Sequence, residues 1–198
     1  RKEYYSVTGR CCIKTQTALL LTLKYHLSDN VEYTRKTLRK LFVENGNKLK
    51  TGFVGTPLMC NILSDNGMED IAWKLLLNED YPGWLREVKL GATTVWERWN
   101  SVLDDGSISG TGMNSLNHYS YGSVVEWMYR HVAGIQATAG TLGFKDVTFT
   151  PSYHWDIKEQ ETSYDSPAGL YRSVWKILDE EHVELTVEVP FGCSAKLQ

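Results

Sequence analysis

The sequence predicts a mainly helical fold followed by a β tail. Up to residue 140, apolar side chains recur at three- and four-residue steps, which is the period of an amphipathic helix. After residue 140, apolar and polar side chains alternate, which is the period of a strand. With 198 residues and 42% hydrophobic side chains, the chain is long and apolar enough for a core. We therefore predict a helical domain over residues 1–140 and a small antiparallel β-domain over residues 141–198.

Four short helices are expected before residue 80. Their apolar side chains cover residues 18–27, 34–42, 56–63 and 69–76. The third helix is expected to begin with Thr56 as a cap and Pro57 in its first turn. Asn-Gly pairs at residues 45–46 and 66–67 are typical helix stops. Consecutive short helices of this kind predict antiparallel helical hairpins.

Regular periodicity fails between residues 80 and 112, where turn-forming Gly, Pro and Asp-Gly sequences dominate. A loop of this size inside a compact domain is usually functional. The loop and the residues just after it are rich in side chains that chemistry uses, namely Trp84, Trp96, Glu97, Arg98, Trp99, Asn100, Asp104, Asp105, Asn114, Asn117, His118 and Tyr119. A further helix is expected from Tyr119 to Val132, with Gly134 as its stop.

The tail predicts four or five short strands. Residues 146–149 and 184–189 alternate between apolar and polar side chains. In the clearest run, the residues that share one face are Tyr171, Ser173, Trp175 and Ile177. So few strands do not guarantee an independent two-sheet sandwich. We therefore expect the tail to dock on the helical part or to pair with strands elsewhere.

Charge and composition argue against several partners. The 21 basic and 24 acidic residues are spread along the chain, so no basic stripe suited to nucleic acid is present. No apolar run approaches the roughly 20 residues that span a bilayer, which excludes membrane insertion. Cysteines and histidines show no metal-ligand spacing, and no P-loop, Rossmann or hydrolase-elbow motif occurs. We predict neither metal nor cofactor, and free or buried thiols, with a pairing of Cys60 or Cys193 as the alternative.

Glu97 is the candidate catalytic carboxylate. It lies between Trp96 and Trp99, whose indoles would desolvate it while polar neighbours orient it. That is a good setting for a general base. From this tetrapeptide alone, a structural ion pair between Glu97 and Arg98 beneath a Trp cluster is the simpler interpretation.

Glycoside cleavage requires a pair of carboxyl groups, one acting as acid and the other as base or nucleophile. The acidic residues near Glu97 do not supply a convincing partner. Asp104 and Asp105 precede Gly106 in a sequence typical of a turn, and Glu87 lies with Lys89 on a segment that predicts a solvated face.

Four sequence motifs, and the order in which they occur, indicate the function more specifically than single residues do. The chain contains, in this order, Thr51-Gly-Phe-Val-Gly-Thr-Pro57, Asp80-Tyr-Pro-Gly-Trp-Leu85, Gly91-Ala-Thr-Thr-Val-Trp-Glu-Arg-Trp-Asn100 and Met113-Asn-Ser-Leu-Asn-His-Tyr-Ser-Tyr-Gly122. These motifs resemble the C-terminal region of the bacterial α-L-rhamnosidases of glycoside hydrolase family 78. Tail segments Gly143-Phe-Lys, Ser166-Pro-Ala-Gly169 and Val189-Pro190 resemble the β-domain that closes those enzymes. The resemblance covers nearly the whole chain, far more than one short pattern would.

The resemblance implies part of an (α/α) six-hairpin toroid followed by a β-domain. It also implies an inverting glycosidase that releases terminal α-L-rhamnose without a cofactor. Glu97 matches the general base of that family, and His118 matches a histidine that contacts the sugar. Trp84, Trp96 and Trp99 are expected as pocket or supporting rings.

The family's general acid lies upstream of the matched region. The resemblance therefore implies a fragment of the enzyme. Because part of a toroid leaves apolar helix faces uncovered, we expect the isolated chain to be inactive, to aggregate, or to associate through those faces. Position 86 is Arg where the family commonly has Tyr, which we expect to alter what the pocket rim accepts. Residues 191–195 are also less typical of the family.

The expected partner is a rhamnose-containing glycoside or polysaccharide, and the sequence does not indicate a compartment. Three alternatives stay open: a different toroidal glycosidase, a non-catalytic carbohydrate-binding module, and a helical scaffold with a β appendage. A binding module would hold rhamnose without further sequence and would be insensitive to Glu97→Gln. A scaffold would show no affinity for sugar.

Overall fold

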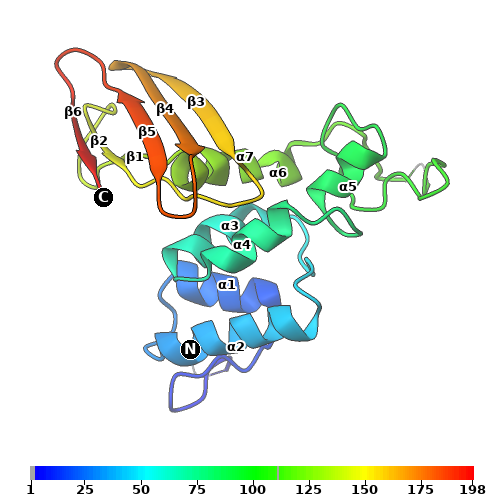
Figure 1. The fold of residues 1–198 in the computed structure, drawn as a ribbon. Helices are drawn as coiled ribbons and strands as arrows, with labels where there is room; N and C mark the ends of the chain where they lie inside the picture. The colour runs from blue at the N-terminus through cyan, green and yellow to red at the C-terminus, as the bar shows by residue number, and fades with distance from the viewer. Residues whose placement is uncertain (1–2, 111) are drawn as a thin grey trace. The chain divides into compact units, whose positions relative to one another are not determined.

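The computed structural model describes residues 3–110 and 112–198 (Figure 1). The chain divides into two compact units, a helical unit up to Val124 and a β unit from Val125. Helices fill the first unit and strands dominate the second. The predicted class, a mainly helical part followed by a β tail, is confirmed.

Short helices that pack in pairs build the helical unit. They are α1 (Gln16–Lys24), α2 (Val31–Glu44), α3 (Thr56–Asp65), α4 (Glu69–Leu76), α5 (Trp84–Lys89) and α6 (Tyr119–Gly122). Helix α1 packs on α2, α3 packs on α4, and α1 and α6 each contact α3 (Figure 1). The buried side chains of this unit include Leu19, Leu38, Phe42, Met59, Leu63 and Ile71. The four helices predicted before residue 80 are α1 to α4.

Local signals account for most helix ends, with one correction. The Thr15 side chain caps α1 by accepting from the Ala18 N–H at 3.2 Å. Gly46 and Gly67 follow α2 and α3 with φ of 65° and 71°, as predicted for the Asn-Gly stops. Thr56 is not the cap of α3, because its hydroxyl is engaged 2.8 Å from the hydroxyl of Thr51 and the cap position is occupied by the preceding residue.

The helix predicted from Tyr119 to Val132 is interrupted. It is divided into α6, α7 (Val124–Trp127) and the π-helix η1 (Met128–Val132). The Ser123 hydroxyl donates to the Ser120 carbonyl at 2.6 Å, where α6 ends. At the end of η1, the Ala133 N–H donates to the Met128 carbonyl at 2.8 Å, which is the wider π-helical spacing.

Two three-stranded sheets form the β unit. The strands are β1 (Ile135–Ala137), β2 (Asp146–Phe149), β3 (Glu159–Ser166), β4 (Gly169–Ile177), β5 (Val183–Glu188) and β6 (Ser194–Leu197). Strands β3, β4 and β5 form an antiparallel meander. In the other sheet β1 pairs antiparallel with β2, but β2 and β6 are parallel, where a wholly antiparallel domain was predicted. The first strand lies before residue 140, and its three residues are too few to show a period of two.

The core of the β unit joins both sheets. Ala133, Ile135, Val147, Phe149 and Tyr171 form one buried cluster. As predicted, alternate β4 residues Tyr171, Ser173 and Trp175 are buried, whereas Ile177 is half-buried. The Ser173 hydroxyl donates to the Ala133 carbonyl at 2.7 Å and the Trp175 indole to the Val132 carbonyl at 2.8 Å. Strand β5 alternates in sequence but is largely exposed.

The four cysteines of the chain are not joined by disulfide bonds. Cys11, Cys12, Cys60 and Cys193 are all free thiols. Burial raises the pKa of the Cys60 thiol to about 12, so this thiol is protonated at neutral pH. Among the described residues, no helix has the length and apolar character needed to cross a bilayer.

Candidate functional site

Two loop segments of the helical unit run side by side and carry Glu97 and His118. The Glu97 N–H donates to the Ser115 carbonyl at 2.9 Å, and the His118 N–H donates to the Val95 carbonyl at 2.8 Å. The Thr94 hydroxyl adds a bond to the Leu116 carbonyl at 2.5 Å. We call residues 94–97 and 115–118 the site ladder. It places the predicted base and the predicted sugar-binding histidine on neighbouring segments.

The Glu97 carboxylate is held by the same ladder. Its Oε2 accepts from the Ser115 N–H at 2.7 Å, and the side chain is half-buried. A charge-assisted bond of this length fixes the orientation of the carboxylate. Arg98 does not take the role that the ion-pair interpretation assigns to it, because its guanidinium donates to the Gly112 carbonyl at 2.6 Å. A backbone amide therefore orients Glu97.

His118 is fixed by both its ring and its backbone. Its Nδ1 accepts from the Ser120 N–H at 3.2 Å and caps α6. In the neutral ring this acceptor role leaves the proton on Nε2, which can donate to a sugar hydroxyl. The ring stacks on Phe53 and Tyr119, with centroids 5.0 and 5.2 Å apart. Phe53 lies in a motif that the sequence singled out, but no local pattern indicated that its ring meets His118.

The three predicted tryptophans lie beneath the surface. Trp84, Trp96 and Trp99 are only 7%, 4% and 8% exposed. Trp99 stacks on Tyr121 at 4.2 Å and meets Trp84 edge-on at 5.3 Å. The Trp84 indole donates to the Tyr121 carbonyl at 2.9 Å. With so little free surface, these rings support the loop segments, and the exposed rings beside His118 are Phe53 and Tyr119.

One expectation about α5 is wrong. Glu87 is 3% exposed and does not lie on a solvated face, because its Oε2 accepts from the Trp96 N–H at 3.2 Å. Arg86 is also largely buried, with 8% of its surface exposed. Its guanidinium donates to the Trp99 carbonyl at 2.9 Å and to the exposed Asp104 carboxylate at 2.6 Å. Both side chains bind segments that follow α5 in the sequence, which spacing within the helix does not reveal.

Burial changes the ionisation of this region. Desolvation raises the pKa of the Glu87 carboxyl to about 7, against the opposing effects of the Trp96 N–H and the Arg86 charge. Burial also raises the pKa of Tyr121, and the charges of Glu87, Tyr81 and Glu97 raise it further. The Tyr121 phenol therefore senses both carboxyl groups, Glu87 and Glu97.

Replacing Glu87 with glutamine is expected to stabilise the chain above pH 7. In the native state the Glu87 carboxyl keeps its proton up to about pH 7, whereas an unfolded Glu loses it near 4.5. The native state thus binds more protons between these values, and the stability contributed by Glu87 falls as pH rises through this window. A glutamine side chain does not ionise, so the Glu87→Gln variant should gain about 2 to 3 kcal/mol over the parent at pH 8.

Urea unfolding at pH 4 and pH 8 measures this difference. The control is Glu44→Gln at the exposed end of α2, which should change stability by less than about 0.5 kcal/mol at either pH. An equal change in the two variants at pH 8 would contradict the buried ionisation of Glu87.

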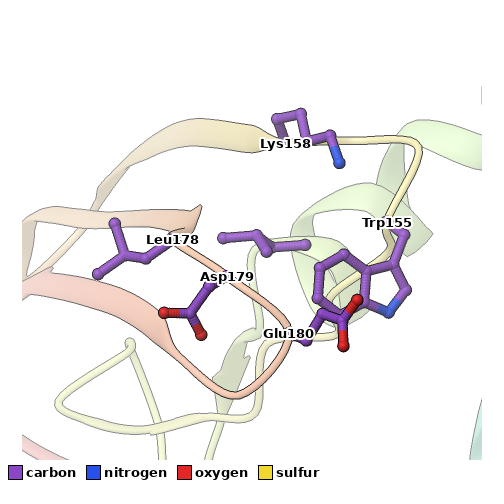
Figure 2. A pocket seen from close by; sticks show the side chains of 6 residues that line it. Trp155, Lys158, Leu178, Asp179 and Glu180 are labelled. Atoms are coloured by element: carbon purple, nitrogen blue, oxygen red, sulfur yellow. The ribbon is translucent and has the colours of Figure 1, made fainter.

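A separate hollow lies in the β unit. It encloses about 800 Å³ and is lined by Trp155, Lys158, Ile177, Leu178, Asp179 and Glu180 (Figure 2). The Lys158 ammonium stands 5.6 Å from the Trp155 ring centroid. Asp179 accepts from the Glu181 and His182 N–H groups at 2.9 Å and pairs with the His182 ring. Its carboxylate closes the β4–β5 turn, so the hollow lacks a free carboxylate pair of the kind that glycoside cleavage uses.

Metal-ligating side chains do not gather within residues 3–110 and 112–198. In those ranges no group of three or more His, Cys, Asp or Glu side chains is placed to hold a metal ion.

Comparison with known proteins first gives the class. Residues 1–132 match the family model described as the bacterial alpha-L-rhamnosidase 6 hairpin glycosidase domain, so the helical hairpins are those of a six-hairpin glycosidase. Residues 134–198 match the bacterial alpha-L-rhamnosidase C-terminal domain. The chain belongs to the bacterial α-L-rhamnosidase family. The two matches meet where η1 ends and β1 begins.

Individual α-L-rhamnosidases match the chain over nearly its whole length. An α-L-rhamnosidase of Formosa agariphila is 38% identical over 186 residues, which are 93% of this chain and 20% of that protein. The crystal structure of the Streptomyces avermitilis α-L-rhamnosidase complexed with L-rhamnose is 33% identical with a TM-score of 0.91, over 99% of this chain and 19% of that one. The crystal structure of the Aspergillus terreus α-L-rhamnosidase is 32% identical with a TM-score of 0.92, and the match covers 99% of this chain and 23% of that one. The chain thus spans about a fifth of the length of these relatives.

Proposed function

We propose that this chain is part of an inverting α-L-rhamnosidase and supplies its general base, Glu97. The observation that carries the proposal is the bond from the Ser115 N–H to Glu97 Oε2, which holds the carboxylate on the site ladder beside His118. Membership of the α-L-rhamnosidase family supports it. The relative from Streptomyces avermitilis is complexed with L-rhamnose, which supports rhamnose as the sugar.

Each site residue has a separate part in the proposed reaction. Glu97 accepts a proton from the water that attacks the anomeric carbon, and the bond from Ser115 keeps the carboxylate aimed at that water. His118 donates from Nε2 to a sugar hydroxyl, since its Nδ1 is occupied by Ser120. Phe53 offers an apolar face next to His118 for the C–H groups of the sugar.

Trp84, Trp96 and Trp99 are proposed as supporting rings beneath these groups. Their burial and their mutual stacking hold the two loop segments in place from below. A direct contact with sugar would require more exposed ring surface than their few per cent.

The general acid is proposed to lie on a part of the enzyme outside this chain. An inverting glycosidase needs a protonated carboxyl group about 6.5 to 9.5 Å from the base. The pKa of Glu87 is about 7, but its carboxyl is buried and its Oε2 is bound to the Trp96 N–H, so it cannot reach a leaving oxygen. Asp104 is engaged by Arg86, and Asp105 accepts bonds from Ser107 in a turn.

The test compares the longer protein that carries this chain with the chain alone. The longer protein is expected to hydrolyse an aryl α-L-rhamnoside and to release the inverted anomer, which NMR of the first product detects. The chain alone is expected to be inactive. It is also expected to self-associate through apolar helix residues such as Val43, which is 64% exposed, and size-exclusion chromatography measures this.

Three results would count against the proposal. Turnover by the chain alone would place the acid within it. Retention of configuration would make Glu97 a nucleophile. Cleavage of another sugar in a panel of aryl glycosides, without cleavage of the rhamnoside, would favour a different toroidal glycosidase.

A further inference from the structure

Two adjacent charged side chains of α5 bind both ends of the segment that contains Glu97. Glu87 Oε2 accepts from the Trp96 N–H at 3.2 Å, one residue before Glu97. Arg86 Nη1 donates to the Trp99 carbonyl at 2.9 Å, two residues after it. We call Arg86 and Glu87 the α5 clamp. Along the chain, α5 is joined to this segment by the turn that follows residue 90.

Both members of the clamp are buried, which strengthens their bonds to the backbone. Hydrogen bonds that involve a charged group are about twice as strong as neutral ones, and a low local dielectric strengthens them further. Burying two charges is nevertheless costly, and apolar side chains of similar volume often stabilise a fold as well or better. The second Glu87 oxygen, Oε1, is buried and meets no hydrogen-bond partner among the described residues. Stability alone therefore does not explain why the ionisable side chains of Arg86 and Glu87 occupy these buried positions.

We propose that Arg86 and Glu87 are positioning residues that hold Glu97 in its working orientation, and that ionisation of Glu87 tunes this hold. The inference rests on the proposed role of Glu97 as general base. The ladder bond from Ser115 fixes the carboxylate of Glu97, whereas the α5 clamp fixes the backbone on either side of it. Small displacements of a catalytic group are costly, since about 1 Å can reduce the rate about a hundredfold.

Ionisation of Glu87 has a defined direction. As the carboxyl loses its proton near pH 7, its oxygen becomes a stronger acceptor for the Trp96 N–H, so the segment is held more firmly at higher pH. Arg86 faces Glu87 from its own helix and favours the charged form. From α6, Tyr121 feels the charges of Glu87, Tyr81 and Glu97. Activity is thus expected to fall as pH drops below about 7.

Two substitutions at position 87 separate positioning from packing. Glu87→Gln keeps an oxygen acceptor but cannot ionise, so it should retain kcat within about threefold at pH 6 and lose the limb of the pH profile near 7. Glu87→Met removes the acceptor at similar volume, and kcat should fall about tenfold while KM changes less than about twofold. Arg86→Lys keeps the charge but not the planar fork, and should also lower kcat. Lys89→Met, on the exposed side of α5, is the matched control and should keep the parent profile.

The measurement is the pH profile of kcat and kcat/KM with an aryl α-L-rhamnoside, in the longer protein that carries this chain. A parent-like profile in Glu87→Gln, or a parent-like kcat in Glu87→Met, overturns the inference. If Glu87→Met does not fold, the profile of Glu87→Gln decides alone. Glu97→Gln measured alongside separates the two hypotheses: if that variant stays active, the role of Glu97 fails, and if it is inactive, only the positioning role is under test.

Discussion

Glu97→Gln is expected to lower kcat of the longer protein about a thousandfold, because a general base contributes roughly 10² to 10⁴ to the rate. The amide has nearly the same shape as the carboxylate, and its oxygen can still accept from the Ser115 N–H at 2.7 Å. What it loses is the ability to take a proton from the attacking water. The fold and the binding of rhamnose should therefore survive while turnover does not.

Steady-state kinetics with an aryl α-L-rhamnoside, combined with thermal unfolding, test this expectation. Unchanged unfolding with lost turnover is the expected combination. Glu32→Gln on α2 is the control, since Glu32 is exposed and pairs with the exposed Lys36 at 3.4 Å. A turnover number within tenfold of the parent in Glu97→Gln would remove this residue from the base role.

Gly134→Ala is expected to destabilise the β unit by about 3 kcal/mol or more, as the sum of backbone strain and overpacking. Gly134 has φ of +74°, which L side chains rarely adopt. An added Cβ would lie 2.5 Å from the Thr150 carbonyl carbon and closer still to the Pro151 nitrogen. These are backbone atoms that cannot rotate away. They lie beside Phe149, a member of the buried core of this unit.

Gly140→Ala provides the matched control for that prediction. Gly140 has a similar φ of +83° in the same unit, but an added Cβ meets nothing within 4 Å. Only the conformational strain remains, and the loss should be about 1 kcal/mol. Urea unfolding of the two variants isolates the clash from the strain. Equal losses would show that the loop at Thr150 moves freely enough to admit a methyl group.

Much of the helical unit was predictable because its signals are local. Pro57 in a first turn, and the Asn-Gly pairs that contain Gly46 and Gly67, mark helix ends wherever the rest of the chain lies. Glu97 and His118 were identified from motifs. Their proximity follows from hydrogen bonds between residues about twenty positions apart, which no periodicity encodes.

Predictions failed where distant segments decide the environment of a residue. Glu87 shares a short helix with Lys89, and that context predicts a solvated face. The Trp96 N–H and the burial around it come from outside the helix. Likewise, the parallel pairing of β2 with β6 joins strands separated by the whole β3–β5 meander. The local sequence of a helix or strand does not indicate which distant segment will contact it.

The site ladder also bears on which part of this region tolerates changes in length. It closes the base of the excursion formed by residues 98–110 and 112–114, in which residues 103–108 are exposed. Loop-closure entropy grows slowly with length, so insertions or deletions within the exposed residues 103–108 should change stability little. Residues 103–108 can therefore lengthen, shorten or change composition while Glu97 and His118 keep their spacing. Exchange of this short outer segment would thus leave the proposed base and the proposed sugar-binding histidine in place.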